Sequence, residues 1–106
     1  MKKTILLLLT ILNLFVAYGQ KRKVLFIGNS YTRVNDLPLI TSGIAMNMGD
    51  TLVYDVSYPD GYTLEQHFTN STTLNKIKAG GWDYVVLQEQ SQRPSFPEYD
   101  FFWAID

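Results

Sequence analysis

Three short apolar runs lie along the chain, and glycine or polar residues close each of them. The first is Val24–Ile27, the second lies within Thr51–Ser57, and the third is Trp82–Leu87. The first and third runs are almost continuously apolar rather than alternating, which is typical of strands covered on both faces of a parallel sheet. We therefore predict three strands, with Lys21-Arg22-Lys23 as a polar lead-in to the first.

Helical spacing separates these strands. Asp36 is the expected cap of the first helix, Pro38 falls in its first turn, where proline is tolerated, and Gly49-Asp50 ends it. The spacing of four apolar residues favours one helical face: Leu39, Ile40, Ile44 and Met48. A second helical segment begins at Thr63 or Thr69 and ends at Ala79, before Gly80-Gly81, with Ser71 as a candidate N-cap.

The alternation of strands and helices predicts an α/β fold with right-handed crossovers and a parallel sheet of strand order 2-1-3. The third strand has no later strand to pair with, and natural proteins avoid apolar edge strands. An aromatic segment, Phe101–Ile105, begins just before the sequence stops. We therefore expect the chain to be the front part of a longer α/β domain.

The first residues have the features of a secretory signal peptide. Met1-Lys2-Lys3 is positively charged, Ile5–Val16 is apolar, and Ala17-Tyr18-Gly19 is a small-x-small cleavage pattern before Gln20. The alternative is a membrane-spanning helix, but a span needs about 20 apolar residues. We predict a signal peptide at 1–19, a domain at 20–106, and a secreted protein, periplasmic or extracellular, of bacterial origin with no stable membrane anchor.

Composition narrows the function classes. The 106 residues carry a formal net charge of −1, which argues against a nucleic-acid binder. The chain has no cysteine, so disulfides, a thiolate nucleophile and cysteine-based zinc sites are excluded. With one histidine and scattered carboxylates, no metal-site pattern exists, and no cofactor is expected.

Candidate chemistry lies in the loops that follow the strands, because ligands of open parallel sheets bind at the carboxyl ends of the strands. These loops are Gly28–Thr32, Pro59–Thr63 and Gln88–Arg93. In the first, Ser30 follows a strand and precedes a helix, so its hydroxyl could face the crevice and its N–H could stabilise an oxyanion. The ordinary alternative is that Ser30 is a turn or N-cap serine.

Three segments together resemble the GDSL/SGNH hydrolases. Val24–Thr32 is similar to their first block, with Asn29 where most members carry aspartate, in the Gly-Asn-Ser-Tyr-Thr form of a secreted bacterial branch. Tyr58–Gly61 resembles the second block and Trp82–Ser91 the third, in family order and spacing. The resemblance implies a flavodoxin-like three-layer α/β/α sandwich and a serine ester hydrolase.

The resemblance also implies roles for single residues. Ser30 would be the nucleophile, and the backbone N–H groups of Ser30 and Gly61 would bind the oxyanion. The third donor, usually an asparagine side chain, is missing; Gln88 or Gln90 is the preferred substitute, while strand register favours Gln92. Asn29 and Tyr31 are candidate pocket residues.

The base that serine needs comes in this family from a C-terminal Asp-x-x-His block, which this sequence lacks. Its only histidine, His67, is either a substitute base or a partly buried helix residue, and we favour the second interpretation because the helix leads away from the strand ends.

We expect a secreted esterase that removes acetyl groups from carbohydrate, with residues 1–106 inactive alone. The alternative is an inactive secreted protein that binds carbohydrate or another ligand. Arg33 and Arg93 could bind an anion or be ordinary surface residues. The tyrosines Tyr31, Tyr58 and Tyr62 could stack on a sugar or pack in the core.

Overall fold

The computed structural model describes residues 1–3 and 19–95. The apolar run of the expected signal peptide and the aromatic segment Phe101–Ile105 lie outside these residues. Within the described part, no helix is both long enough and apolar enough to span a membrane.

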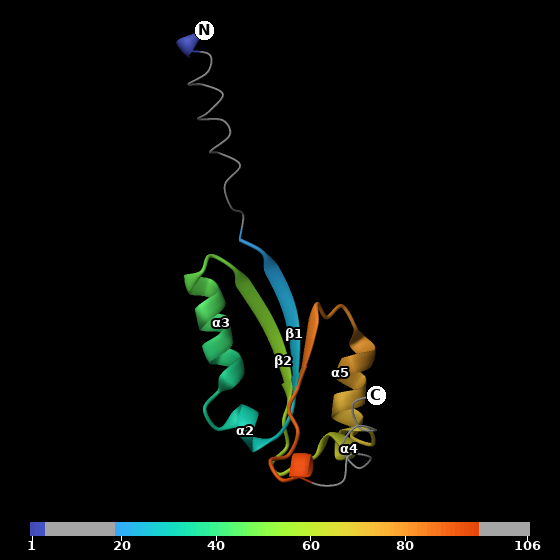
Figure 1. The fold of residues 1–106 in the computed structure, drawn as a ribbon. Coiled ribbons are helices and arrows are strands. Elements are labelled where there is room, and N and C mark those ends of the chain that lie inside the picture. The colour runs from blue at the N-terminus through green and yellow to red at the C-terminus, as the bar shows by residue number, and fades with distance from the viewer. Residues whose placement is uncertain (4–18, 96–106) are drawn as a thin grey trace.

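The described chain forms a three-stranded parallel sheet (Figure 1). Its strands are β1 (Lys21–Ile27), β2 (Thr51–Ser57) and β3 (Tyr84–Leu87), in the order β2-β1-β3. Strand β1 pairs along its whole length with β2 and through its last four residues with β3. The predicted α/β class, parallel pairing and strand order 2-1-3 are therefore confirmed.

Helices lie on both sides of this sheet. Figure 1 shows α3 (Leu37–Asn47) on one side and α4 (Leu64–His67) with α5 (Ser71–Ala79) on the other. The short helix α2 (Ser30–Arg33) follows β1 directly, and a 3-10 turn, η1, spans Arg93–Ser95. All strands end at the lower edge in Figure 1, which is also where α2 and α4 begin.

The second helical segment consists of two helices rather than one. Thr63 caps α4: its side chain accepts from the N–H of Gln66, and its own N–H donates to the side-chain oxygen of Gln66. The cap of α5 is Asn70, not Ser71, because the Asn70 side chain accepts from the N–H of Thr73. Each capping side chain satisfies a first-turn N–H that has no partner inside its helix.

The core surrounds β1, whose last four residues, Val24–Ile27, are all buried. Leu25 and Ile27 pack with Leu64 of α4 and with the partly buried Trp82 on the α4–α5 side. On the α3 side the rings of Phe26 and Tyr54 meet edge to face at 6.2 Å. The continuous apolar run therefore predicts this strand correctly as one covered on both faces.

Two apolar surfaces remain exposed. The face of α3 that carries Leu39, Ile40 and Ile44 is open to solvent, although its spacing resembles that of a packed face. Helix α3 instead meets the sheet through small residues, and the Ser42 hydroxyl donates to the Leu52 carbonyl at 3.2 Å. All four residues of β3 are exposed, and within the described residues β3 pairs only with β1 and forms an edge.

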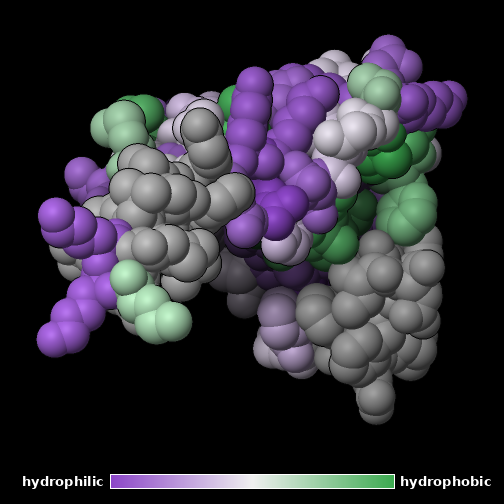
Figure 2. All heavy atoms as spheres, turned by 90° about the horizontal axis from the view of Figure 1, so that it is seen from above, coloured by the Kyte–Doolittle hydropathy of each residue, from purple (hydrophilic) through white to green (hydrophobic). Residues whose placement is uncertain are grey.

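The opposite end of the molecule is polar. Figure 2 views it from above, where the strands begin, and hydrophilic side chains occupy the middle of this surface. The exposed residues Lys21, Arg22 and Lys23 start β1 here. Asp83 accepts from the Lys23 N–H at 2.7 Å and faces Arg22 at 3.8 Å. The polar lead-in thus begins the central strand rather than preceding it.

Candidate active site

The three loops at the carboxyl edge of the sheet are tied to one another. The Asn29 side chain, after β1, donates to the carbonyl of Tyr62, after β2, at 2.9 Å. The Gln88 side-chain oxygen, after β3, accepts from the Asn29 N–H at 3.1 Å and from the Thr32 hydroxyl at 2.9 Å. Polar groups of all three loops therefore meet at one edge, as predicted from the parallel topology.

Ser30 is the first residue of α2, and its hydroxyl is uncommitted. The N-cap is Asn29, whose side chain accepts from the Tyr31 N–H at 3.0 Å, so the interpretation of Ser30 as an N-cap serine is wrong. Neither the hydroxyl nor the N–H of Ser30 has a hydrogen-bond partner among residues 1–3 and 19–95. The half-buried Ser30 therefore offers a free hydroxyl and a free helix-terminal N–H.

The two neighbours of Ser30 differ in environment. Asn29 is 1% exposed, and its amide is used on both sides, by Tyr31 and Tyr62. Tyr31 is 67% exposed. Asn29 therefore holds the loop around Ser30 in place through its hydrogen bonds, while Tyr31 lies at the surface next to Ser30.

Gly61 adopts a conformation that favours glycine. Its φ is +72°, in the left-handed region, although a side chain there would meet no atom within 4 Å. Its N–H has no hydrogen-bond partner in the described part of the chain. The backbone at Gly61 can therefore donate to a ligand, as the predicted oxyanion role requires.

A polar hollow of about 550 Å³ lies beside Gly61. Its other lining residues carry amide, carboxylate, hydroxyl or guanidinium groups: Thr63, Glu65, Gln66, Gln90, Gln92 and Arg93. Arg93 pairs with Glu65 at 2.6 Å at this site. Arg33 likewise pairs through two nitrogens with Asp60, so both candidate anion-binding arginines hold carboxylates of their own chain.

The three candidate glutamines have different partners. Gln88 uses its oxygen on Asn29 and Thr32, and its nitrogen donates to the Glu89 carbonyl. Gln90 accepts from the Gln92 N–H at 2.7 Å through its oxygen, and both residues line the hollow beside Gly61. Gln88 therefore braces the Ser30 loop, while Gln90 and Gln92 share a hollow with Gly61.

His67 is buried, with 4% of its surface exposed, and both ring nitrogens have partners. Nε2 lies 2.8 Å from the Gly28 carbonyl oxygen and Nδ1 lies 2.7 Å from the Thr73 hydroxyl. Burial lowers the pKa of His67 below the ordinary 6.5, against opposing effects of the Gly28 bond and the Glu89 charge. The interpretation of His67 as a buried helix residue is therefore supported, since no nitrogen is left to take a proton from Ser30. The expectation that its helix leads away from the strand ends is wrong, because the contact with Gly28 places the ring at the end of β1.

Three further polar residues build this edge, and no sequence pattern singles them out. Glu89 accepts from the Leu64 N–H at 3.0 Å and from the Gln90 N–H at 2.6 Å, which joins the loop after β3 to the start of α4. Ser57 and Thr73 are buried and share a hydrogen bond of 2.7 Å. Only their position after a strand or in the first turn of a helix sets these residues apart in the sequence.

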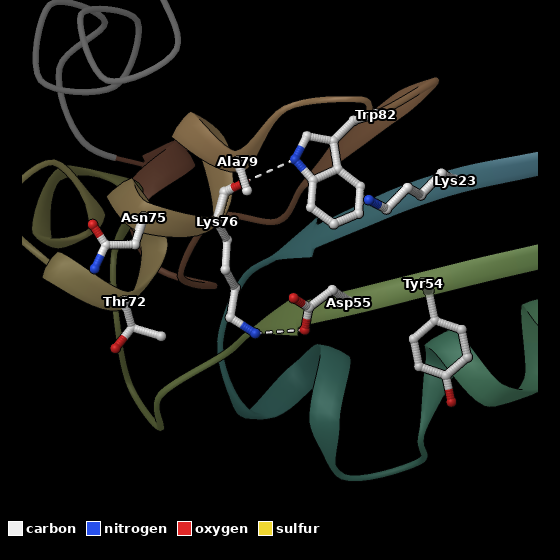
Figure 3. Close-up of a pocket in the computed structure, with 8 residues that line it drawn as sticks. All are labelled: Lys23, Tyr54, Asp55, Thr72, Asn75, Lys76, Ala79 and Trp82. Carbon is white, nitrogen blue, oxygen red and sulfur yellow. Dashed lines mark hydrogen bonds and ion pairs between the residues drawn. The ribbon is translucent and has the colours of Figure 1, made fainter.

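A second hollow lies away from these loops, between α5 and the sheet (Figure 3). It is lined by Lys23 and Trp82, whose ammonium nitrogen and ring centre are 4.5 Å apart, and by the Asp55–Lys76 pair. None of the predicted site residues lines it. Within the described ranges, no group of three or more histidine or acidic side chains could hold a metal ion.

Comparison with known proteins gives no match for this chain among family models, curated proteins or solved structures.

Proposed function

We propose that the protein is a secreted serine ester hydrolase of the SGNH type, with a flavodoxin-like α/β/α sandwich and Ser30 as its nucleophile. The observation that carries the proposal is the hydroxyl of Ser30, which has no hydrogen-bond partner within the described residues and lies at the start of a helix directly after the central parallel strand. The resemblance of the three loop segments to the family blocks supports it independently.

The reaction is acyl transfer to water. Ser30 Oγ attacks the ester carbonyl carbon, its proton passes to a base, and the alcohol leaves with a proton as the acyl-serine forms. Water then releases the acid and restores Ser30. The base is not His67, whose nitrogens are occupied; the resemblance assigns it to an Asp-x-x-His block, which residues 1–106 do not contain.

The oxyanion would be held by the N–H groups of Ser30 and Gly61 and by a glutamine amide. Gln90 is the best candidate for the third donor, because it lines the hollow beside Gly61 and its oxygen already accepts from Gln92. That bond leaves the Gln90 nitrogen to donate. Loss of one such donor typically lowers kcat by about 10²–10³-fold.

Acetyl groups on carbohydrate are the proposed substrate class. The hollow beside Gly61 is lined by amide, carboxylate and guanidinium groups, which form hydrogen bonds with sugar hydroxyls. Among the described residues, no aliphatic or aromatic side chain lines it, so only the carbon atoms of these polar side chains could contact a long acyl chain. The proposal therefore expects acetate esters to be cleaved faster than octanoate esters.

A ligand-binding protein without turnover is the second candidate. It is favoured by one observation, namely that the only histidine of the sequence is committed to Gly28 and Thr73. This candidate expects sugar esters to bind without being cleaved.

Hydrolysis of p-nitrophenyl acetate by the native protein separates the two candidates. The hydrolase proposal predicts that Ser30→Ala lowers kcat by at least about 10⁴-fold, the usual loss for a triad serine. Ser42→Ala is the matched control, because the Ser42 hydroxyl donates to the Leu52 carbonyl of β2 and lies outside the candidate site. The activity of Ser42→Ala should remain within about twofold of the wild type, as for most surface substitutions. Hydrolysis that survives Ser30→Ala would overturn the nucleophile assignment.

A further inference from the structure

His67, which does not serve as the base, is one member of a closed ring of hydrogen bonds. A carbonyl oxygen can only accept, so His67 Nε2 carries the proton that is donated to Gly28 at 2.8 Å. The neutral imidazole then accepts at Nδ1, and the Thr73 hydroxyl donates to it at 2.7 Å in preference to the Asn70 side-chain oxygen, which is 3.3 Å away. The contacts on both sides therefore select one tautomer of His67.

The ring closes through the end of β2. The Thr73 hydroxyl, which donates to His67, accepts from the Ser57 hydroxyl at 2.7 Å. The Ser57 carbonyl in turn accepts from the Gly28 N–H at 2.9 Å. The ring thus joins the ends of β1 and β2 to α4 and α5, and all four of its residues lie at or next to the carboxyl edge of the sheet.

The ring acts on the peptide unit that precedes the nucleophile. The Gly28 carbonyl belongs to the Gly28–Asn29 peptide, whose N–H donates to the Gln88 side chain at 3.1 Å. His67 therefore holds one edge of this peptide plane and Gln88 holds the other. The next peptide carries the N–H of Ser30, so a rotation of the Gly28–Asn29 plane would turn that N–H and displace the Ser30 hydroxyl.

We propose that His67 is a positioning residue for Ser30, which acts by fixing the Gly28–Asn29 peptide rather than by accepting a proton. The inference rests on the proposed function of Ser30. A nucleophile misplaced by about 1 Å can cost about 10²-fold in rate, so this fixed peptide matters most for kcat. Among the described residues, Glu89 is the charged side chain whose charge acts on the His67 ring.

Two substitutions of His67 separate positioning from base catalysis. In the native protein, His67→Leu removes both hydrogen bonds and should lower kcat for p-nitrophenyl acetate by about 10²-fold, with KM changed less than about threefold. His67→Gln retains an N–H that can reach the Gly28 carbonyl and should keep kcat within about tenfold of the wild type. The pH profile of kcat should be the same in His67→Gln and the wild type, because another group is the base.

Two results in this series would overturn the proposal. Wild-type kcat in a folded His67→Leu would show that the ring does not position Ser30. Activity of His67→Gln as low as that of Ser30→Ala would identify His67 as the base. If His67→Leu fails to fold, Thr73→Val provides the same test, since it removes the donor to Nδ1 at nearly constant volume and should lower kcat by about tenfold.

A readout independent of activity keeps the two proposals distinguishable. Nitrogen-15 NMR of the imidazole should show the neutral form with the proton on Nε2, and His67→Leu should shift the Asn29 amide resonance. A proton on Nδ1, or an unshifted Asn29 resonance, would overturn the positioning role whether or not hydrolysis is observed. Absence of Ser30-dependent hydrolysis in the wild type would overturn the proposed function instead.

Discussion

At the scale of single residues, the site consists of a few polar side chains whose partners are already assigned. Asn29, Gln88 and His67 each satisfy backbone groups of the Ser30 loop, and Asn29 and His67 are almost fully buried. Buried polar groups without partners cost about 1–3 kcal/mol each, so this arrangement stabilises one loop conformation. The hydroxyl of Ser30, by contrast, has no partner in the part of the chain that the structure describes and is left for chemistry.

The buried His67 makes stability depend on pH. Its pKa lies below 6.5 in the folded protein, mainly because burial disfavours the charged ring, so the unfolded chain binds the proton more readily. His67 therefore stabilises the fold fully above pH 6.5, and this contribution is lost as the pH falls through the lower folded-state pKa. The urea midpoint should fall between about pH 7.5 and pH 5 in the wild type and less in His67→Gln.

Asp55, the other group whose pKa is shifted, does not contribute to this pH dependence. The Lys76 hydrogen bond holds the pKa of Asp55 below 3.8, so Asp55 remains charged throughout that range and its contribution is lost only at lower pH. A urea concentration at the unfolding midpoint that rises on acidification from pH 7.5 to pH 5 would contradict the neutral, buried state of His67.

At the scale of elements, the sequence predicts strands better than the surfaces that cover them. The run Val24–Ile27 has the continuous apolarity of a central strand, and β1 is buried on both faces. The similar run in Tyr84–Leu87 forms an exposed edge, and the apolar face of α3 is also exposed. Periodicity reports which residues share a face, but burial depends on which other elements reach that face, which local sequence does not encode.

In the loops between the elements, too, some contacts could be predicted from the sequence and others could not. Parallel topology predicts that Gly28–Thr32, Pro59–Thr63 and Gln88–Arg93 meet, and bonds from Asn29 and Gln88 join them. The ring through Ser57, Thr73 and His67 could not be predicted, because its members are separated in sequence and meet only when α4 and α5 pack on the sheet. Long-range polar contacts of this kind carry no periodic signal.

Two glycines of these loops, Gly28 and Gly61, give a prediction. A side chain at Gly28 would lie 2.7 Å from the Gln88 oxygen and from the Thr32 hydroxyl, so Gly28→Ala should displace Gln88 from the Asn29 N–H. We expect a loss of about 1–3 kcal/mol in the free energy of unfolding and of about 10²-fold in kcat. Gly61→Ala should cost about 1 kcal/mol through its positive φ while it retains its N–H and most of the activity.

Gly43→Ala is the matched control. It lies inside α3 with no atom within 4 Å of the added carbon, so the free energy of unfolding should rise by about 0.5–1 kcal/mol at unchanged activity. Urea unfolding and p-nitrophenyl acetate hydrolysis measure both quantities. A Gly28→Ala protein as active as Gly43→Ala would contradict the role of Gln88 in the Ser30 loop.

At the scale of the whole molecule, the expected signal peptide, residues 1–19, precedes the three-stranded sheet and its polar edge. The export proposal rests on the charged start, the apolar run and the small-x-small pattern before Gln20. It predicts that the protein recovered from outside its source cells begins at Gln20. The N-terminal peptide, identified by mass spectrometry, checks this, and an N-terminus that still contains Ile5–Val16 would contradict it.

The central claim is that Ser30 is the nucleophile, and covalent labelling tests it most directly. The native protein is treated with a fluorophosphonate probe, digested and analysed by mass spectrometry to locate the adduct. We expect one adduct, on Ser30, which is absent in Ser30→Ala and retained in Ser42→Ala. An adduct on another residue, or an unlabelled native protein, would contradict it.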